Sequence, residues 1–189
     1  RTAFRDEIEA MIKGFHKTIV NMRAMPKPII ASVRGAVAGA GVSVMLACDL
    51  VLATESSFFT LAYCHLGTSP DGGSTFALPR VTGMKRAMEI ALLGDRFDAI
   101  TAERWGLLNR VVPETELDME TESLAQRLAS GPTYAYARTK GLVNESLSHS
   151  LQEQLDAETM AFAECAITDD FIEGVNAFNE KRTPIFKGA

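Results

Sequence analysis

The segment Gly35–Gly41 (GAVAGAG) constrains the fold more than any other part of the sequence. It follows Ile29–Val33, a run rich in β-branched residues that is typical of a buried strand. Val42–Ala47 then indicates a short helix, and Leu50–Ala53 indicates a second strand. A strand, a glycine-rich turn, a helix and another strand predict a right-handed βαβ crossover and a parallel sheet.

The remaining segments are mostly helical in pattern. Apolar residues recur at helical spacing over 4–23, and Pro26 ends that segment, which predicts a helix with one apolar face. Residues 58–60 are a candidate third strand. The first half is therefore α/β and the second half all-helical. Further helices are predicted over 74–82, 84–93, 99–105, 116–130, 133–146, 148–166 and 169–182.

Length and composition limit the classes of function. A chain of 189 residues can bury a sizeable core without disulfides, and its net charge of −5 argues against a nucleic-acid partner. Its three cysteines form no CxxC pair or ligand spacing with histidine, which predicts reduced thiols, a cytoplasmic location and no metal site. No apolar run approaches the roughly 18–20 residues of a membrane span, so we expect no membrane partner.

The glycine spacing excludes three known site motifs and leaves two interpretations. It does not fit the dinucleotide fingerprint, the P-loop or the nucleophile elbow. Small residues at a helix start let backbone N–H groups approach a ligand, and such amides can hold a developing oxyanion. The alternative is a tight turn required by close packing of the helix on the sheet.

Asp71 is the second candidate. It lies in Ser69–Gly73 (SPDGG), a composition typical of a turn, directly before the helix predicted from Ser74. Its carboxylate is either the cap of that helix or a general base at a loop–helix junction. Near the C-terminus, Lys181 and Arg182 either complement the helix dipole or bind a phosphate group.

Taken together, these segments resemble the crotonase (enoyl-CoA hydratase/isomerase) superfamily. The likeness lies in their order along essentially the whole chain, because each piece alone is weak. The matching segments are 27–31 (KPIIA), 35–41, 47–50 (ACDL), 53–55 (ATE), 66–70 (LGTSP), 73–80 (GSTFALPR), 86–89 (RAME), 94–96 (GDR), 102–112 (AERWGLLNRVV) and 178–182 (FNEKR).

The resemblance implies an α/β fold, a crotonase-like ββα spiral. Its core would cover residues 1–115, and a C-terminal helical region, 116–189, would build a homotrimer or a hexamer. The family's N-terminal strands, with one of its two oxyanion donors, would be missing from this chain. The substrate would be an acyl-CoA thioester, as in fatty acid metabolism, and coenzyme A would be part of that substrate, with no separate cofactor.

The resemblance also implies roles for individual residues. Ala40 would donate its N–H to the thioester oxygen. Ser43 and Tyr63 stand where hydratases carry two glutamates, and neither is a carboxylate. Asp71 stands where dienoyl-CoA and epoxyphenylacetyl-CoA-type isomerases, and 4-chlorobenzoyl-CoA dehalogenase, place an aspartate. The residues expected to bind substrate are Ala36, Gly39, Gly41, Ala62, Tyr63 and Ser69 near the acyl group, and Phe178 and Lys181 at coenzyme A.

These assignments favour a double-bond isomerase in which Asp71 is the acid and base and Ala40 stabilises the enolate. An enoyl-CoA hydratase, which is a lyase, is the alternative within the enzymes, since another base could place water. A non-catalytic acyl-CoA-binding scaffold is the alternative outside them.

Overall fold

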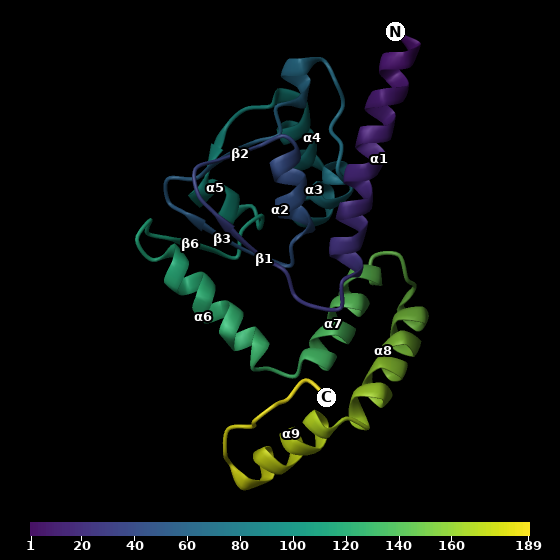
Figure 1. Ribbon diagram of the computed structural model, residues 1–189, viewed down its shortest axis with the longest axis vertical. Helices are drawn as coiled ribbons and strands as arrows, with labels where there is room; N and C mark the ends of the chain where they lie inside the picture. Colours follow the sequence, from purple (N-terminus) through teal and green to yellow (C-terminus); the bar gives the residue numbers. More distant parts are fainter. The chain divides into compact units, whose positions relative to one another are not determined.

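The computed structural model describes all 189 residues. It divides into two compact units (Figure 1). The N-terminal unit comprises Arg1–Arg23 and Ile29–Thr121, and the C-terminal unit comprises Ala24–Pro28 and Glu122–Ala189.

Three parallel strands form the first sheet of the N-terminal unit. They are β1 (Ile30–Val33), β3 (Leu50–Thr54) and β6 (Arg110–Val112), in the order β1-β3-β6. β1 pairs in parallel with β3, so that Ile30 lies opposite Leu50. The predicted parallel pairing of the two strands that flank the glycine segment is therefore confirmed.

A second sheet of three short strands contains part of the glycine segment. β2 (Ala36–Ala38) pairs in parallel with β4 (Phe58–Thr60), and β5 (Phe97–Asp98) pairs antiparallel with β4. The prediction that residues 35–41 form a turn throughout is wrong, because three of them are a strand. Their small side chains carry little β propensity, and the pairing with β4 supplies the hydrogen bonds that define the strand.

The prediction of an all-helical second half is also wrong. β5 has two residues and β6 has three, and strands this short show no alternation that a sequence pattern could reveal. β6 is a strand because it pairs with β3, where Ala53 lies opposite Val111. Such pairing between distant segments is a tertiary effect.

The helices of the N-terminal unit match the predicted segments closely. Glycine bounds two of them as predicted, since Gly83 lies between α3 and α4 and Gly94 follows α4. The helices are α1 (Thr2–Ala24), α2 (Ala40–Ala47), α3 (Ser74–Thr82), α4 (Met84–Leu93) and α5 (Ala99–Arg104), and α6 (Leu117–Ala129) begins in this unit.

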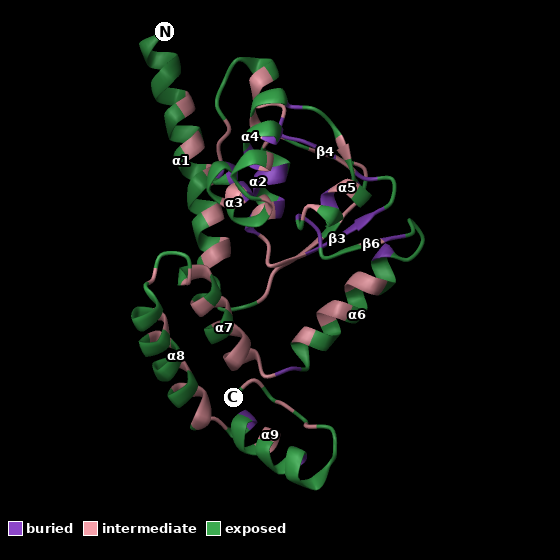
Figure 2. Ribbon diagram, turned by 180° about the vertical axis from the view of Figure 1, so that it is seen from behind, coloured by how far each residue is buried: buried purple, intermediate pink, exposed green.

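The hydrophobic core lies where α2, α3 and α4 meet the strands (Figure 2). Phe59 of β4 is completely buried and Leu78 of α3 is 1% exposed. Burial of side chains of this size contributes roughly 1.5–3 kcal/mol each. The β4 strand is therefore firmly anchored, which fixes the start of the loop that follows it.

The C-terminal unit contains α7 (Thr133–Glu145), α8 (Leu151–Ala166) and α9 (Asp169–Glu180). The predicted helix over 148–166 begins later, at Leu151, because Ser150 and Glu153 form a capping box. That signal, serine followed three residues later by glutamate, is visible in the sequence.

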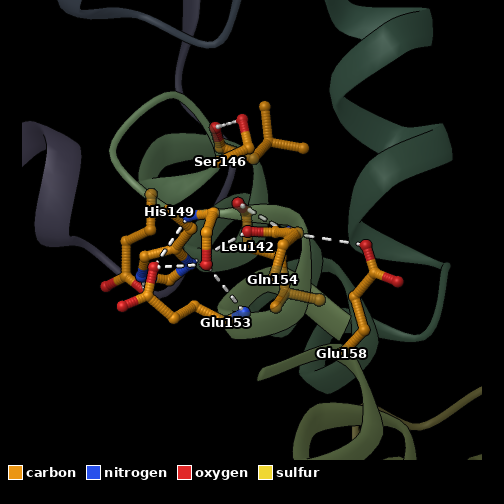
Figure 3. Close-up of polar contacts among 9 residues, drawn as sticks. Leu142, Ser146, His149, Glu153, Gln154 and Glu158 are labelled. Atoms are coloured by element: carbon orange, nitrogen blue, oxygen red, sulfur yellow. Dashed lines mark hydrogen bonds and ion pairs between the residues drawn. The ribbon is translucent and has the colours of Figure 1, made fainter. Parts of the chain in front are cut away.

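Polar side chains hold the corner between α7 and α8 (Figure 3). The Gln154 amide nitrogen donates to the Leu142 carbonyl at 3.3 Å, and its amide oxygen lies 3.0 Å from Nδ1 of His149. Because the amide oxygen can only accept, Nδ1 of His149 carries the proton of this bond. The side chain of Gln154 in α8 therefore links α8 to the end of α7 and to the loop that follows it.

Two acidic residues of α9 hold the C-terminal tail. Asp170 is 4% exposed and accepts the backbone N–H groups of Lys187 and Gly188 at 2.7 and 2.8 Å. Glu173 accepts two hydrogen bonds from Arg182, at 2.6 and 2.8 Å, and one from the N–H of Ile185 at 2.8 Å. The tail is therefore bound to α9 mainly by carboxylates.

The hydrogen bonds between the Glu173 carboxylate and the C-terminal tail depend on pH. The Arg182 guanidinium, followed by the Ile185 N–H, lowers the pKa of Glu173 from 4.5 to about 2. A carboxylate with a lowered folded-state pKa stabilises the fold fully above its unfolded value, and this stabilisation is lost as pH falls through the folded value. We therefore expect exchange of the Ile185 amide hydrogen to be slow at neutral pH and to accelerate as pH falls below about 4.5 towards 2, after correction for intrinsic exchange.

Glu173→Gln should show fast exchange at Ile185 already at neutral pH. The matched control is Glu180→Gln, because Glu180 contacts Arg182 but accepts nothing from the tail backbone. Equal protection of the Ile185 amide in Glu173→Gln and the unaltered chain would contradict this role.

Candidate functional site

The carboxyl ends of β2 and β4 lie at one edge of the second sheet. The pairing of Ala38 with Thr60 continues into Gly39, whose N–H donates to the Thr60 carbonyl at 3.0 Å. The chain then passes from β2 into α2, and from β4 towards a short 3-10 helix, η1 (Tyr63–Leu66). Ligands of open parallel sheets bind beyond the carboxyl ends of the strands, so this edge is the natural place for a site.

The peptide between Gly39 and Ala40 has a backbone conformation that requires glycine. Gly39 has φ 52° and ψ −119°, which lies outside the regions open to residues with a Cβ. Ala40 is the first residue of α2, so its N–H has no acceptor within the helix. Since ψ of Gly39 sets the direction of the Ala40 N–H, the glycine determines where that donor points.

Close packing of the helix on the sheet does not explain the glycines. A Cβ on Gly41 would meet Val37 Cγ1 at 3.5 Å, an ordinary contact, and a Cβ on Gly35 would meet nothing within 4 Å. Gly35 and Gly39 instead have positive φ values, 69° and 52°. Backbone conformation is therefore the reason for two of the three glycines.

The Asp71 carboxylate does not cap α3. The residue that caps the start of α3 is Gly73, and no side chain makes a capping bond there. Oδ1 of Asp71 instead accepts a hydrogen bond from the hydroxyl of Tyr63. The helix-cap interpretation of this carboxylate is therefore wrong, and its partner is the first residue of η1.

Hydrogen bonds fix the main chain around Asp71. Its carbonyl accepts the hydroxyl groups of Ser43, at 2.8 Å, and Ser74, at 3.0 Å. The N–H of Gly72 donates to Nε2 of His16 in α1 at 3.1 Å. Ser43 and Ser74 are buried, so the bonds of their two hydroxyl groups are shielded from water, and each contributes about 1 kcal/mol. The loop therefore presents the Asp71 side chain from a fixed backbone.

Tyr63 links the glycine segment to Asp71. A Cβ on Gly39 would lie 3.9 Å from Cε2 and Cζ of the Tyr63 ring, so the ring lies beside that peptide. Partial burial, together with the hydrogen bond to Asp71, raises the pKa of Tyr63 from 10.0 to about 12. The hydroxyl therefore stays protonated at neutral pH and acts as a donor.

Ala62 turns the chain from β4 towards Tyr63. It is half-buried and has φ 53°, a conformation that costs a residue with a Cβ roughly 1–2 kcal/mol. This strained residue directly precedes Tyr63, the tyrosine that contacts Asp71.

The other residues predicted to bind substrate are spread over both units. Ala36, Gly41 and Ser69 are exposed in the N-terminal unit. Phe178, 82% exposed near the end of α9, belongs to the C-terminal unit, as does Lys181, which ends that helix in the left-handed conformation. The structure thus brings Gly39, Tyr63 and Asp71 together within one unit.

The model of the family Enoyl-CoA hydratase/isomerase matches residues 6–189. The chain belongs to the enoyl-CoA hydratase/isomerase family. It is 39% identical over 178 residues to the 1,2-epoxyphenylacetyl-CoA isomerase of Escherichia coli, covering 94% of this chain and 68% of that protein. It is also 38% identical over 187 residues to a Rhodobacter capsulatus protein called "Probable enoyl-CoA hydratase", covering 99% and 70%.

Solved structures of the family have the same fold. The crystal structure of an enoyl-CoA hydratase from Polaromonas sp. JS666 matches with a TM-score of 0.91 and 37% identity. The match covers 96% of this chain and 71% of that one. The prediction of a crotonase-like α/β fold is therefore confirmed.

Within this family member, sequence reasoning missed two residues of α1 that contact the Asp71 loop. His16 accepts the Gly72 N–H, and the Phe15 ring would lie 2.5 Å from a Cβ on Gly72. The helical spacing of the apolar residues places Phe15 on the packed face of α1. This spacing does not indicate which loop the packed face contacts. Nothing in the sequence distinguishes His16 as a residue of the site.

The structure shows no cluster of three or more histidine, cysteine, aspartate or glutamate side chains that could hold a metal ion. No helix combines the length and the hydropathy needed to cross a membrane.

Gly72→Ala should destabilise the fold strongly. Gly72 has φ 61°, and an added Cβ would lie 2.6 Å from Cβ of the buried Ser43 as well as against Phe15. Left-handed strain of roughly 1–2 kcal/mol and overpacking of about 1–3 kcal/mol predict a loss of about 2–4 kcal/mol in the free energy of unfolding. Urea denaturation measures this loss.

The matched control is Gly67→Ala. Gly67 has φ 71°, and a Cβ there would meet nothing within 4 Å, so it carries the backbone strain without the clash. Equal losses in the two variants would show that α1 and α2 do not pack tightly on the loop.

Proposed function

We propose that this family member is a double-bond isomerase of enoyl-CoA thioesters, with Asp71 as the acid and base. The observation that carries the proposal is the hydrogen bond from Tyr63 to the Asp71 carboxylate, beside the peptide of Gly39 and Ala40. It supports a role for the carboxylate at the carboxyl edge of the second sheet, and the alternative role as a helix cap is absent.

The chemistry needs one carboxylate and one oxyanion donor from this part of the chain. The substrate is a 3-enoyl thioester whose carbonyl oxygen accepts the N–H of Ala40. Asp71 removes a proton from the α-carbon, the C–H bond breaks, and its electron pair moves through the carbonyl carbon to form a dienolate. The resulting carboxylic acid returns the proton to the γ-carbon, the thioester carbonyl forms again, and the double bond is now conjugated.

Hydration would need a group that places and activates water. By the resemblance to the family, Ser43 and Tyr63 stand where its hydratases carry glutamates. Ser43 is 1% exposed and its hydroxyl is committed to the Asp71 carbonyl. Tyr63, whose pKa is raised, holds its proton. Neither residue is therefore suited to remove a proton from water near neutral pH, which favours isomerisation.

Two residues of the C-terminal unit are proposed to bind coenzyme A. The exposed ring of Phe178 and the exposed ammonium group of Lys181 are suited to contact the adenine and a phosphate of coenzyme A. By likeness to the family, they would do so in a homotrimer or hexamer.

Asp71→Asn tests the base directly. The amide keeps the shape of the side chain and removes its basicity, so kcat for isomerisation of a 3-enoyl-CoA should fall by about 10²–10⁴-fold. The absorbance of the conjugated product measures the rate. Unchanged turnover would remove Asp71 from the mechanism.

The same assay distinguishes the alternatives. Incorporation of water into a 2-enoyl-CoA, detected by mass, would favour a hydratase. Calorimetric binding of the thioester without turnover of either substrate would favour a non-catalytic binder.

Gly39→Ala tests the oxyanion donor. Alanine cannot adopt φ 52° and ψ −119°, so the Gly39–Ala40 peptide must rotate and the Ala40 N–H must turn away. Loss of one oxyanion donor costs about 10²–10³ in kcat. The matched control is Gly35→Ala at the other end of β2, where φ is also positive and a Cβ would meet nothing. Equal activity losses in both variants would contradict the assignment.

A further inference from the structure

We propose that Tyr63 positions the catalytic carboxylate: its hydroxyl binds Oδ1 of Asp71, so that Oδ2 is the oxygen that takes and returns the substrate proton. This inference rests on the proposed function and adds a second residue to the same site. It gives Tyr63 a role in the proton transfer rather than in lining the acyl pocket.

The arrangement of donors around Asp71 leads to this role. The main-chain carbonyl of Asp71 is held by Ser43 and Ser74, and the next N–H is held by His16. None of these bonds reaches the carboxylate. The hydroxyl of Tyr63 is the side-chain donor that does, so it restricts rotation of the carboxylate about χ2, which is otherwise broad for aspartate.

The two carboxylate oxygens thereby become different. A phenol hydroxyl donates one hydrogen bond, and it is directed at Oδ1. When Asp71 takes the proton from the substrate, Oδ1 can keep accepting from Tyr63 while the proton resides on Oδ2. The hydrogen bond therefore persists through both halves of the reaction, and Tyr63 neither gains nor loses a proton.

The position of the Tyr63 ring connects this function to the oxyanion donor. The ring lies beside Gly39, within ordinary contact distance of where a Cβ would be, and Gly39 sets the direction of the Ala40 N–H. The raised pKa of Tyr63 keeps the hydroxyl a donor across the neutral range. One side chain thus fixes the base relative to the peptide that holds the enolate.

Tyr63→Phe is the test, assayed on the full chain with a 3-enoyl-CoA. The variant keeps the ring and removes the hydroxyl, so kcat should fall about 10- to 100-fold through loss of orientation, while KM changes little. A raised KM with unchanged kcat would overturn the proposal, because it would make Tyr63 a lining residue. The matched control is Tyr134→Phe, which removes a hydroxyl bonded to Arg138 and should leave kcat unchanged.

A double-mutant cycle shows whether Tyr63 acts through Asp71. In the Asp71→Asn background, Tyr63→Phe should cause no further loss of kcat, because the base that it positions is gone. A further loss of the same size as in the unaltered chain would overturn the proposal. If Asp71→Asn retains full activity, the proposed function itself fails; if only Tyr63→Phe does, the failure is confined to this inference.

A rescue variant covers the case in which Tyr63→Phe folds poorly. para-Aminophenylalanine at position 63 keeps the ring and an N–H donor, and it should retain most of the kcat that phenylalanine loses. Activity no higher than that of a folded Tyr63→Phe, or equal to that of Asp71→Asn, would contradict a positioning hydrogen bond.

Discussion

The parallel pairing of β2 with β4 is the constraint on which the site depends. It brings Gly39 beside Thr60 and so sends two chain segments away from the same edge of the sheet. One segment enters α2 through the Gly39–Ala40 peptide, and the other turns at Ala62 to present Tyr63. The buried ring of Phe59 anchors β4 in the core, so the geometry of this edge is tied to the stability of the whole N-terminal unit.

The main chain of Asp71 and its carboxylate are held by different groups. Buried serine hydroxyls and His16 hold the backbone around Asp71, so that the loop cannot drift from α1 and α2. The carboxylate itself is half-buried and is held by Tyr63. A carboxylate enclosed by several donors would be stabilised as an anion and would be a poor base. The Tyr63 hydroxyl orients the group through Oδ1, an arrangement compatible with the proposed role of Asp71 as acid and base.

Much of the fold could be predicted from local pattern. The bounds of α3 and α4 agree with the predicted segments because glycine residues flank them. The short strands β2, β5 and β6 could not be predicted, since two or three residues carry no periodicity and exist as strands only through pairing. Gly39, Tyr63 and Asp71 were named from the sequence, but the hydrogen bond between Tyr63 and Asp71 and the contacts of Phe15 and His16 with the Asp71 loop were not.

The sequence by itself determined the candidate residues: glycines before a helix start, and Asp71, with Ser43 and Tyr63 where the resemblance to the family implies glutamates in hydratases. These are properties of residue type and order, whereas the family is shown by the match of its model to residues 6–189. The tertiary structure decided which contacts each residue makes, because direction and contact depend on segments far apart in the chain. The glycine segment is one strand and one peptide of fixed orientation. Asp71 is a partner of Tyr63 and not a helix cap, because the pairing of β4 with β2 and the packing of α1 and α2 leave its side chain facing that hydroxyl.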